Sequence, residues 1–148
     1  MSLRRGQDIP QADHVLRHVG PSKLRRDENR NVVGVRGDAF KARANEGLSV
    51  NWLEFVQGTE VHQVAECLKM MQTGLSIKKS SVLAKINVET FRALSHQEGY
   101  RIRVVYDPLD ENEGHSEIRH LPSENDELLD MLADQGIVRR ISCAEFIE

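Results

Sequence analysis

The sequence has only two cysteines, Cys67 and Cys143, and they do not lie at a spacing typical of a metal site. This predicts two free, largely buried thiols in a reducing cytosol. No stretch approaches the roughly 18 consecutive apolar residues of a membrane helix. Residues 1–14 also lack the apolar core of a secretory signal. We therefore expect a cytoplasmic protein with no membrane partner.

Charge of one sign is not in large excess. The formal net charge is -3 and the pI is about 6.1, so nucleic acid is not an expected partner. Local basic patches stay open, because four dibasic pairs occur: Arg4-Arg5, Arg25-Arg26, Lys78-Lys79 and Arg139-Arg140. The length of 148 residues and the 39% hydrophobic content suit one globular domain.

Familiar cofactor and catalytic motifs are missing. The sequence has no Walker A loop, no dinucleotide-binding glycine motif, no nucleophile elbow and no Cys-x-x-Cys. The acidic loop ending at Gly114 fails as a calcium loop, because Leu109 and His120 would take the first and twelfth positions. His14 and His18 lie four apart, but Val15 stands where a zinc enzyme has glutamate. We expect no cofactor and no metal.

Hydrophobic periodicity predicts strands interleaved with helices in one domain over 13–148, after a flexible lead-in over 1–12. Helices are expected at 13–20, 59–74, 87–99 and 123–136, with N-caps at Asp13, Thr59, Asn87 and Ser123. Strands are expected at 31–35, 48–52, 82–88, 100–106, 115–121 and 137–142. The first two strands are short, and a loop or hairpin would join them, with the hairpin favoured. This pattern favours an α+β fold, with three main helices packed on a mixed sheet.

The clearest helix begins at Thr59, a good N-cap, and ends at Gly74. At about 100° per residue, its apolar residues fall on one arc. They are Val61, Val64, Ala65, Cys67, Leu68 and Met71. This arc is expected to pack against the sheet.

The segment GLSVNWLEFVQG changes its pattern at the only tryptophan. Leu48, Val50 and Trp52 alternate with polar residues, and then Leu53 is apolar on the other parity. This change indicates a strand that leaves the sheet by a bulge or turn. It places Glu54 at the strand end, either as a site carboxylate or, more commonly, as an exposed turn residue.

Four polar residues at expected element ends are candidate catalytic residues: His14, Arg17, Glu54 and His115. His115 follows an acidic loop and could act as acid or base near neutrality, or simply be hydrated in a turn. Arg17 or Lys23 could hold a phosphate. Whether His14, Glu54 and His115 converge is open from the sequence.

The chain resembles a group of small bacterial proteins of unassigned function. The resemblance covers about residues 13–135 and rests on an LSVNWLE-like segment, Leu48–Glu54, and on Asp107-Pro108 followed by Asn112 and His115. It implies a bacterial cytosolic protein and supplies candidate positions without a chemistry.

Two functions from different classes follow. The first is a non-catalytic protein-interaction module whose partner is another protein, since no catalytic motif is recognised. The alternative is a small hydrolase or transferase acting on a phosphate-bearing substrate, which requires the candidate residues to share a pocket. The oligomeric state is open.

Overall fold

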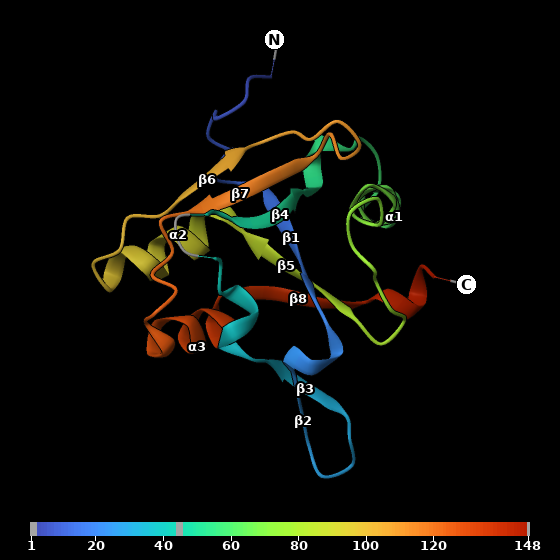
Figure 1. Cartoon of the computed structure of the whole chain (residues 1–148), viewed down its shortest axis with the longest axis vertical. Coiled ribbons are helices and arrows are strands. Elements are labelled where there is room, and N and C mark those ends of the chain that lie inside the picture. The colour runs from blue at the N-terminus through green and yellow to red at the C-terminus, as the bar shows by residue number, and fades with distance from the viewer. Residues whose placement is uncertain (1–2, 44–45, 148) are drawn as a thin grey trace.

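A six-stranded antiparallel sheet forms the centre of the computed structural model, which describes residues 3–43 and 46–147 (Figure 1). Its strand order is β6-β7-β4-β1-β5-β8. These strands are β1 His14–Val19, β4 Leu48–Trp52, β5 Val82–Asn87, β6 Arg103–Tyr106, β7 His115–Arg119 and β8 Ile137–Ser142. A separate hairpin pairs β2, Leu24–Arg26, with β3, Val32–Val35.

Three helices cover the sheet: α1 Glu60–Met71, α2 Val88–Gln97 and α3 Asp126–Gln135. Figure 1 shows α1 on one side of the sheet and α2 and α3 on the other. The predicted α+β fold, with three helices packed on one sheet, is confirmed. The observed strand pairs are all antiparallel, so the sheet is not mixed.

The first predicted helix, over 13–20, is wrong, because these residues form the central strand β1. Val15 packs in the core beneath α2 and α3, whereas its neighbour Leu16 packs in the core beneath α1. Both side chains are fully buried. A strand that is covered on both faces carries apolar residues at adjacent positions. The apolar residues Val15, Leu16 and Val19 therefore have the spacing expected on one side of a short helix.

The predicted hairpin between 31–35 and 48–52 is also wrong, although both strands exist. β3 pairs with β2, which lies within the charged stretch 23–30, and β4 lies between β1 and β7. The connecting chain contains a short 3₁₀ helix, Gly37–Phe40, that packs on α3. Residues 44–45 of this connection lie outside the described part of the chain.

The prediction for α1 is confirmed in its cap and most of its buried face. Thr59 accepts a hydrogen bond from the His62 amide, and Val64, Cys67, Leu68 and Met71 are buried. Val61 is an exception, with 69% of its surface exposed. It lies at the margin of the apolar arc, and the helix rests on a narrower stripe.

The other helix caps are confirmed in part. Asn87 caps α2 as predicted, by accepting from the Thr90 amide. The cap of α3 is Asn125 and not Ser123. The Ser123 hydroxyl instead accepts a hydrogen bond from the Ala42 amide, which fixes the position of the chain before β4.

The N-terminal segment lies along the edge strand β6, where the sequence predicts a flexible lead-in. The Ile9 amide donates to Val104, and the Tyr106 amide donates to Gln7. Ile9 is 2% exposed and belongs to the core. This segment therefore covers one edge of the sheet. None of the described helices is long and apolar enough to cross a membrane.

Both cysteines are free and buried, as predicted. Burial raises the pKa of the Cys67 thiol to about 12 and that of Cys143 to about 11. Because the thiolate is the reactive form, neither thiol is expected to react with iodoacetamide in the native protein at about pH 8. Both are expected to react in denaturant, as mass spectrometry can count. Rapid alkylation of the native protein would contradict the buried placement.

Candidate functional site

A small pocket lined by polar and apolar side chains lies where two central strands separate. β1 pairs with β4 only through Val15–Trp52 and Leu16–Asn51, whereas it pairs with β5 along its whole length. Beyond Leu16 the two strands are not paired in the described structure. Arg17, from β1, and Ser49, from β4, line the pocket at this point.

Arg17 is a largely buried cation. Its Nε donates to the Ala39 carbonyl and its Nη1 to the Ser49 carbonyl, each at 3.0 Å. Burial lowers the pKa of the guanidinium to about 10, so it is charged at neutral pH. In the described part of the chain it forms no ion pair. A guanidinium has five N–H donors and two of them are used here, which leaves three for a bound anion.

Ser49 links Arg17 to His115. The Ser49 hydroxyl lies 3.1 Å from His115 Nε2, and His115 Nδ1 lies 2.7 Å from the Asp107 carbonyl oxygen. A carbonyl only accepts, so Nδ1 carries the proton. In the neutral ring Nε2 therefore accepts, and the Ser49 hydroxyl donates to it. A carboxylate oxygen of Asp107 lies 3.6 Å from Nδ1.

This arrangement can activate the Ser49 hydroxyl as a nucleophile. Ser49 is exposed, while His115 is only 8% exposed and held by the Asp107 segment. A serine, a histidine base and a group that orients the base are the elements that activate a hydroxyl. Arg17 adds a positive charge on the backbone side of the same serine.

An amide pair fixes the wall beside this group. Asn51 and Asn112 exchange two hydrogen bonds, at 2.8 and 2.9 Å, and both side chains are buried. The pair ties β4 to the loop before β7. Two further contacts join β4 to β7 at this point. Asn51 is the backbone pairing partner of His115, and the Ser49 hydroxyl is bonded to His115 Nε2.

The pocket has an apolar side as well. Met71, Leu75 and Leu109 line it, in a volume of about 190 Å³. Leu75 and Leu109 are about half exposed, at 45% and 49%. The pocket thus offers cationic and hydroxyl groups on one side and an apolar surface on the other.

A second hollow, of about 540 Å³, shares Arg17 and His18 with the pocket. Lys23, Lys41 and Asp38 also line it. Lys23 pairs with Asp38 and Lys41 pairs with Asp126, each at 3.2 Å. Arg17 is the cation of this hollow that has no ionic partner among the described residues. A negatively charged group approaching Arg17 therefore meets a net positive surface.

His14 and Glu54 form a separate pair. Glu54 accepts from the His14 amide at 2.7 Å and lies 2.6 Å from His14 Nδ1. Neither residue lines the pocket around Ser49. The four predicted catalytic residues therefore fall into two pairs, and Glu54 lies against His14, not His115.

This second pair explains the change of pattern at the tryptophan. β4 ends at Trp52, and the chain turns into a short 3₁₀ helix, Leu53–Phe55. The Trp52 indole donates to Asp13 at 2.9 Å, next to the Glu54 contacts with His14. The carboxylate of Glu54 thus fixes the start of β1 to the end of β4.

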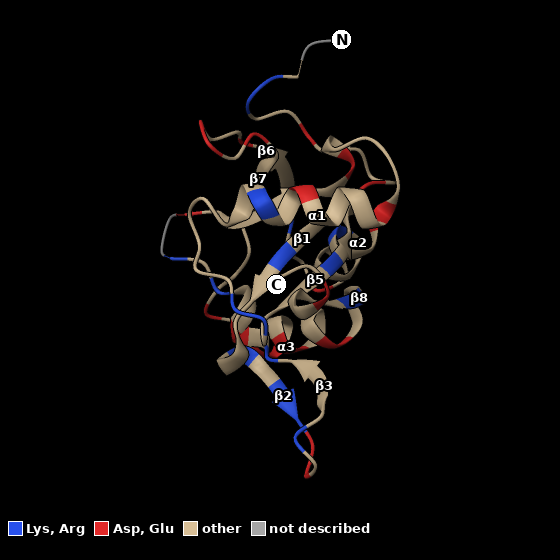
Figure 2. Ribbon diagram, turned by 90° about the vertical axis from the view of Figure 1, so that its right-hand side faces the viewer, with Lys and Arg blue, Asp and Glu red and all other residues tan. Residues whose placement is uncertain are grey.

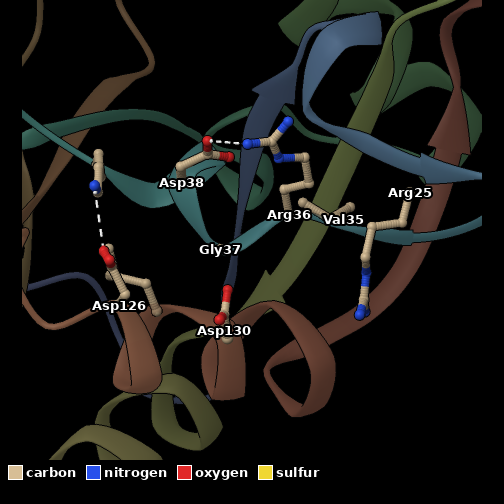
Figure 3. Close-up of a pocket in the computed structure, with 9 residues that line it drawn as sticks. Arg25, Val35, Arg36, Gly37, Asp38, Asp126 and Asp130 are labelled. Atoms are coloured by element: carbon tan, nitrogen blue, oxygen red, sulfur yellow. Dashed lines mark hydrogen bonds and ion pairs between the residues drawn. The ribbon is translucent and has the colours of Figure 1, made fainter.

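The hollow drawn in Figure 3 lies between the Gly37–Phe40 segment and α3. Its charges neutralise each other: Arg36 pairs with Asp38 at 2.9 Å, and Lys41 pairs with Asp126 at 3.2 Å. A Cβ atom on Gly37 would collide with Asp130. This charge arrangement fits close docking of two segments better than ligand binding.

No cluster of three or more His, Cys, Asp or Glu side chains suited to a metal occurs among the described residues. His14 and His18 belong to a strand, so the helical spacing considered from the sequence does not apply.

Sequence reasoning identified Arg17 and His115 but missed Ser49 as a member of the site. Serine is common, and Ser49 lies 66 positions from His115. The available signal was weak: Ser49 occupies the polar parity of the strand that leads to Trp52. Asp107 was named only as a neighbour of His115 in the sequence.

Comparisons with family models, with curated proteins and with solved structures find no match to this chain. The resemblance to a group of bacterial proteins stays a prediction.

The pH dependence of stability gives a test of the surroundings of Arg17. Burial, and then the charge of Arg17, lower the pKa of His18. The unfolded chain, with an ordinary pKa of about 6.5, therefore binds a proton that the folded protein does not. The free energy of unfolding is expected to fall as the pH falls below that value.

Urea unfolding across this pH range measures the effect. In His18→Asn the decline should be shallower than in the wild type. His96→Asn, on the exposed face of α2, is the matched control and should keep the wild-type decline. Equal declines in wild type and His18→Asn would contradict the placement of His18 beside Arg17.

Proposed function

We propose that this protein is a hydrolase that transfers the phosphoryl group of a small phosphomonoester to Ser49 and then to water. The observation that carries the proposal is the hydrogen bond between the Ser49 hydroxyl and His115 Nε2, next to a partly buried arginine with unused donors. This is the second of the two functions considered from the sequence.

The first step uses Ser49 as nucleophile and His115 as base. Ser49 Oγ attacks phosphorus, its proton passes to His115 Nε2, and the bond from phosphorus to the leaving oxygen breaks. The leaving oxygen takes that proton from Nε2. The products are an alcohol and a phosphoserine at position 49.

The second step reverses the roles. A water molecule gives a proton to His115 Nε2 and attacks phosphorus, and Ser49 Oγ leaves and takes the proton back. The Asp107 carbonyl holds Nδ1–H in both steps, and the Asp107 carboxylate stabilises the imidazolium that forms during each step.

Arg17 supplies the electrostatic part. Phosphoryl transfer depends on positioning and on neutralising charge on the phosphoryl oxygens. The unused N–H groups of Arg17 are fixed donors in a largely buried position, where such donors act strongly. The apolar side formed by Met71, Leu75 and Leu109 suits an apolar leaving group.

The proposal is tested by trapping the intermediate. The protein is mixed with 4-nitrophenyl phosphate, release of nitrophenol is followed, and acid-quenched samples are digested for mass spectrometry. We expect turnover, and phosphorylation of the peptide that contains Ser49. Turnover of 4-nitrophenyl acetate without turnover of 4-nitrophenyl phosphate would contradict phosphoryl transfer and indicate acyl transfer.

A matched pair of arginine variants tests the role of Arg17. Arg17→Met is expected to lose phosphate turnover, because it removes the charge beside Ser49. Arg101→Met, at an exposed position before β6, should retain it. Equal loss or equal retention in the two variants would contradict the assigned anion site.

A further inference from the structure

The two edge strands of the main sheet differ in what covers their outer backbone groups. The outer edge of β6 is covered by the N-terminal segment, through hydrogen bonds of Gly6, Ile9 and Tyr106. β8 is the strand at the opposite edge and pairs only with β5 in the described part of the chain. Its outer backbone N–H and C=O groups are therefore available to another strand.

A groove runs beside this open edge. It lies between β8 and the β2–β3 hairpin and has a volume of about 410 Å³. Val33 and Val138 line it and are 54% and 56% exposed. Exposed valines on facing walls provide an apolar surface that the described chain does not cover.

The groove is also basic. Arg25, Arg139 and Arg140 line it, against a single carboxylate, Asp134. Arg25 lies over Gly34, where an added Cβ would meet its guanidinium at 2.7 Å. Arg25, from one dibasic pair of the sequence, thus meets the pair Arg139-Arg140 here. Figure 2 shows β2 with its basic residues on the protruding hairpin.

The three arginines are not equally engaged. Arg25 is 3.8 Å from Asp134, and Arg139 binds Glu60. Arg140 is exposed and has no ionic partner among the described residues. An incoming carboxylate could pair with Arg140 without displacing an existing ion pair.

We infer that this groove binds an extended acidic segment of another protein, which adds to β8 as an antiparallel or parallel strand. Val138 and Arg140 lie two residues apart on β8, and Val33 and Arg25 lie on the facing hairpin, so a strand that carries both acidic and apolar side chains matches both properties of the groove. Its carboxylates would pair with Arg140 and Arg25, and its apolar side chains would cover Val33 and Val138. This surface is distinct from the Ser49 pocket.

Nucleic acid is the less favoured occupant. The exposed valines offer nothing to a phosphate backbone, and no aromatic side chain lines the groove for base stacking. The overall charge of -3 also opposes it.

Labelled short peptides test the inference by fluorescence anisotropy. The first alternates glutamate with valine, the second alternates lysine with valine, and a short single-stranded DNA is the third probe. We expect binding of the glutamate peptide alone. No binding of that peptide, equal binding of the lysine peptide, or tighter binding of the DNA would each overturn the inference.

Strand addition and simple charge attraction are separated by a modified peptide. Methylation of alternate backbone nitrogens on the pairing edge removes its hydrogen-bond donors and keeps its charge. This peptide is expected to lose binding, whereas methylation along the opposite edge should not. Equal binding of the two methylated peptides would overturn the strand-addition geometry.

Charge-reversal variants place the site on the protein. Arg140→Glu is expected to weaken binding of the glutamate peptide by about tenfold or more, because like charges then face each other. Arg101→Glu makes the same change of net charge near the opposite edge and should bind as the wild type does. Circular dichroism verifies that both variants are folded, and equal affinities would overturn the assignment.

Discussion

Ser49→Ala is expected to lower the turnover of 4-nitrophenyl phosphate by about 10³-fold or more, the scale on which loss of a nucleophile acts in covalent catalysis. The variant keeps the Arg17 contact, because Arg17 binds the Ser49 carbonyl and not its hydroxyl. Substrate binding should therefore change little. The measurement is kcat and KM for the purified variant.

The matched control is Ser80→Ala, at an exposed turn position. It should retain wild-type turnover. A Ser49→Ala variant with wild-type kcat would remove the covalent mechanism, even if Arg17 proved to bind phosphate.

His115 provides the second arm of the same prediction. His115→Gln should lower kcat on a similar scale, because the base that receives the Ser49 proton is lost. Since Ser49 and His115 act as one unit, the double variant should be little worse than either single variant. Multiplied losses in the double variant would show that the two residues act separately.

The sequence predicted the elements whose period and caps agree. α1 has an N-cap, an apolar stripe and a terminating turn, and each is local in sequence. The junction between β5 and α2 was likewise predictable, because Asn87 is both the last strand residue and a helix cap. In these segments local propensity and tertiary packing favour the same structure.

β1 could not be predicted from local pattern. Its residues alternate between two covered faces of a sheet whose other strands lie far away in sequence. The hairpin of β2 and β3 was missed for a related reason. β2 has only three residues, two of them exposed arginines, so no hydrophobic alternation marks it.

The candidate site was only half predictable. Residue type and position at element ends singled out Arg17 and His115, and the structure places both against Ser49. Whether Glu54 lies near His115 was open from the sequence, and the turn after Trp52 directs Glu54 to His14. A contact between side chains more than sixty positions apart, such as Ser49 with His115, depends on which strands are neighbours in the sheet. Local sequence patterns do not give this strand order.

Leu68→Ala is expected to lower the free energy of unfolding by about 2–5 kcal/mol. Leu68 is 3% exposed and belongs to the core between α1 and the sheet, with Leu16, Leu83 and Ile141. Truncation removes buried methyl groups and leaves a cavity that these neighbours fill only in part. Urea unfolding at constant pH gives the loss from the shift in midpoint.

Glu66→Ala, two residues earlier on α1, is the matched control for this helix. Glu66 is partly exposed, and its ion pair with Lys69 spans 3.3 Å on the helix surface. Exposed pairs of this kind contribute little, so its loss should change stability by less than about 0.5 kcal/mol. The ratio of the two losses in free energy of unfolding tests which face of α1 is buried. Comparable shifts in midpoint would contradict the packing of Leu68 against β1 and β5, and with it the placement of α1 on this face of the sheet.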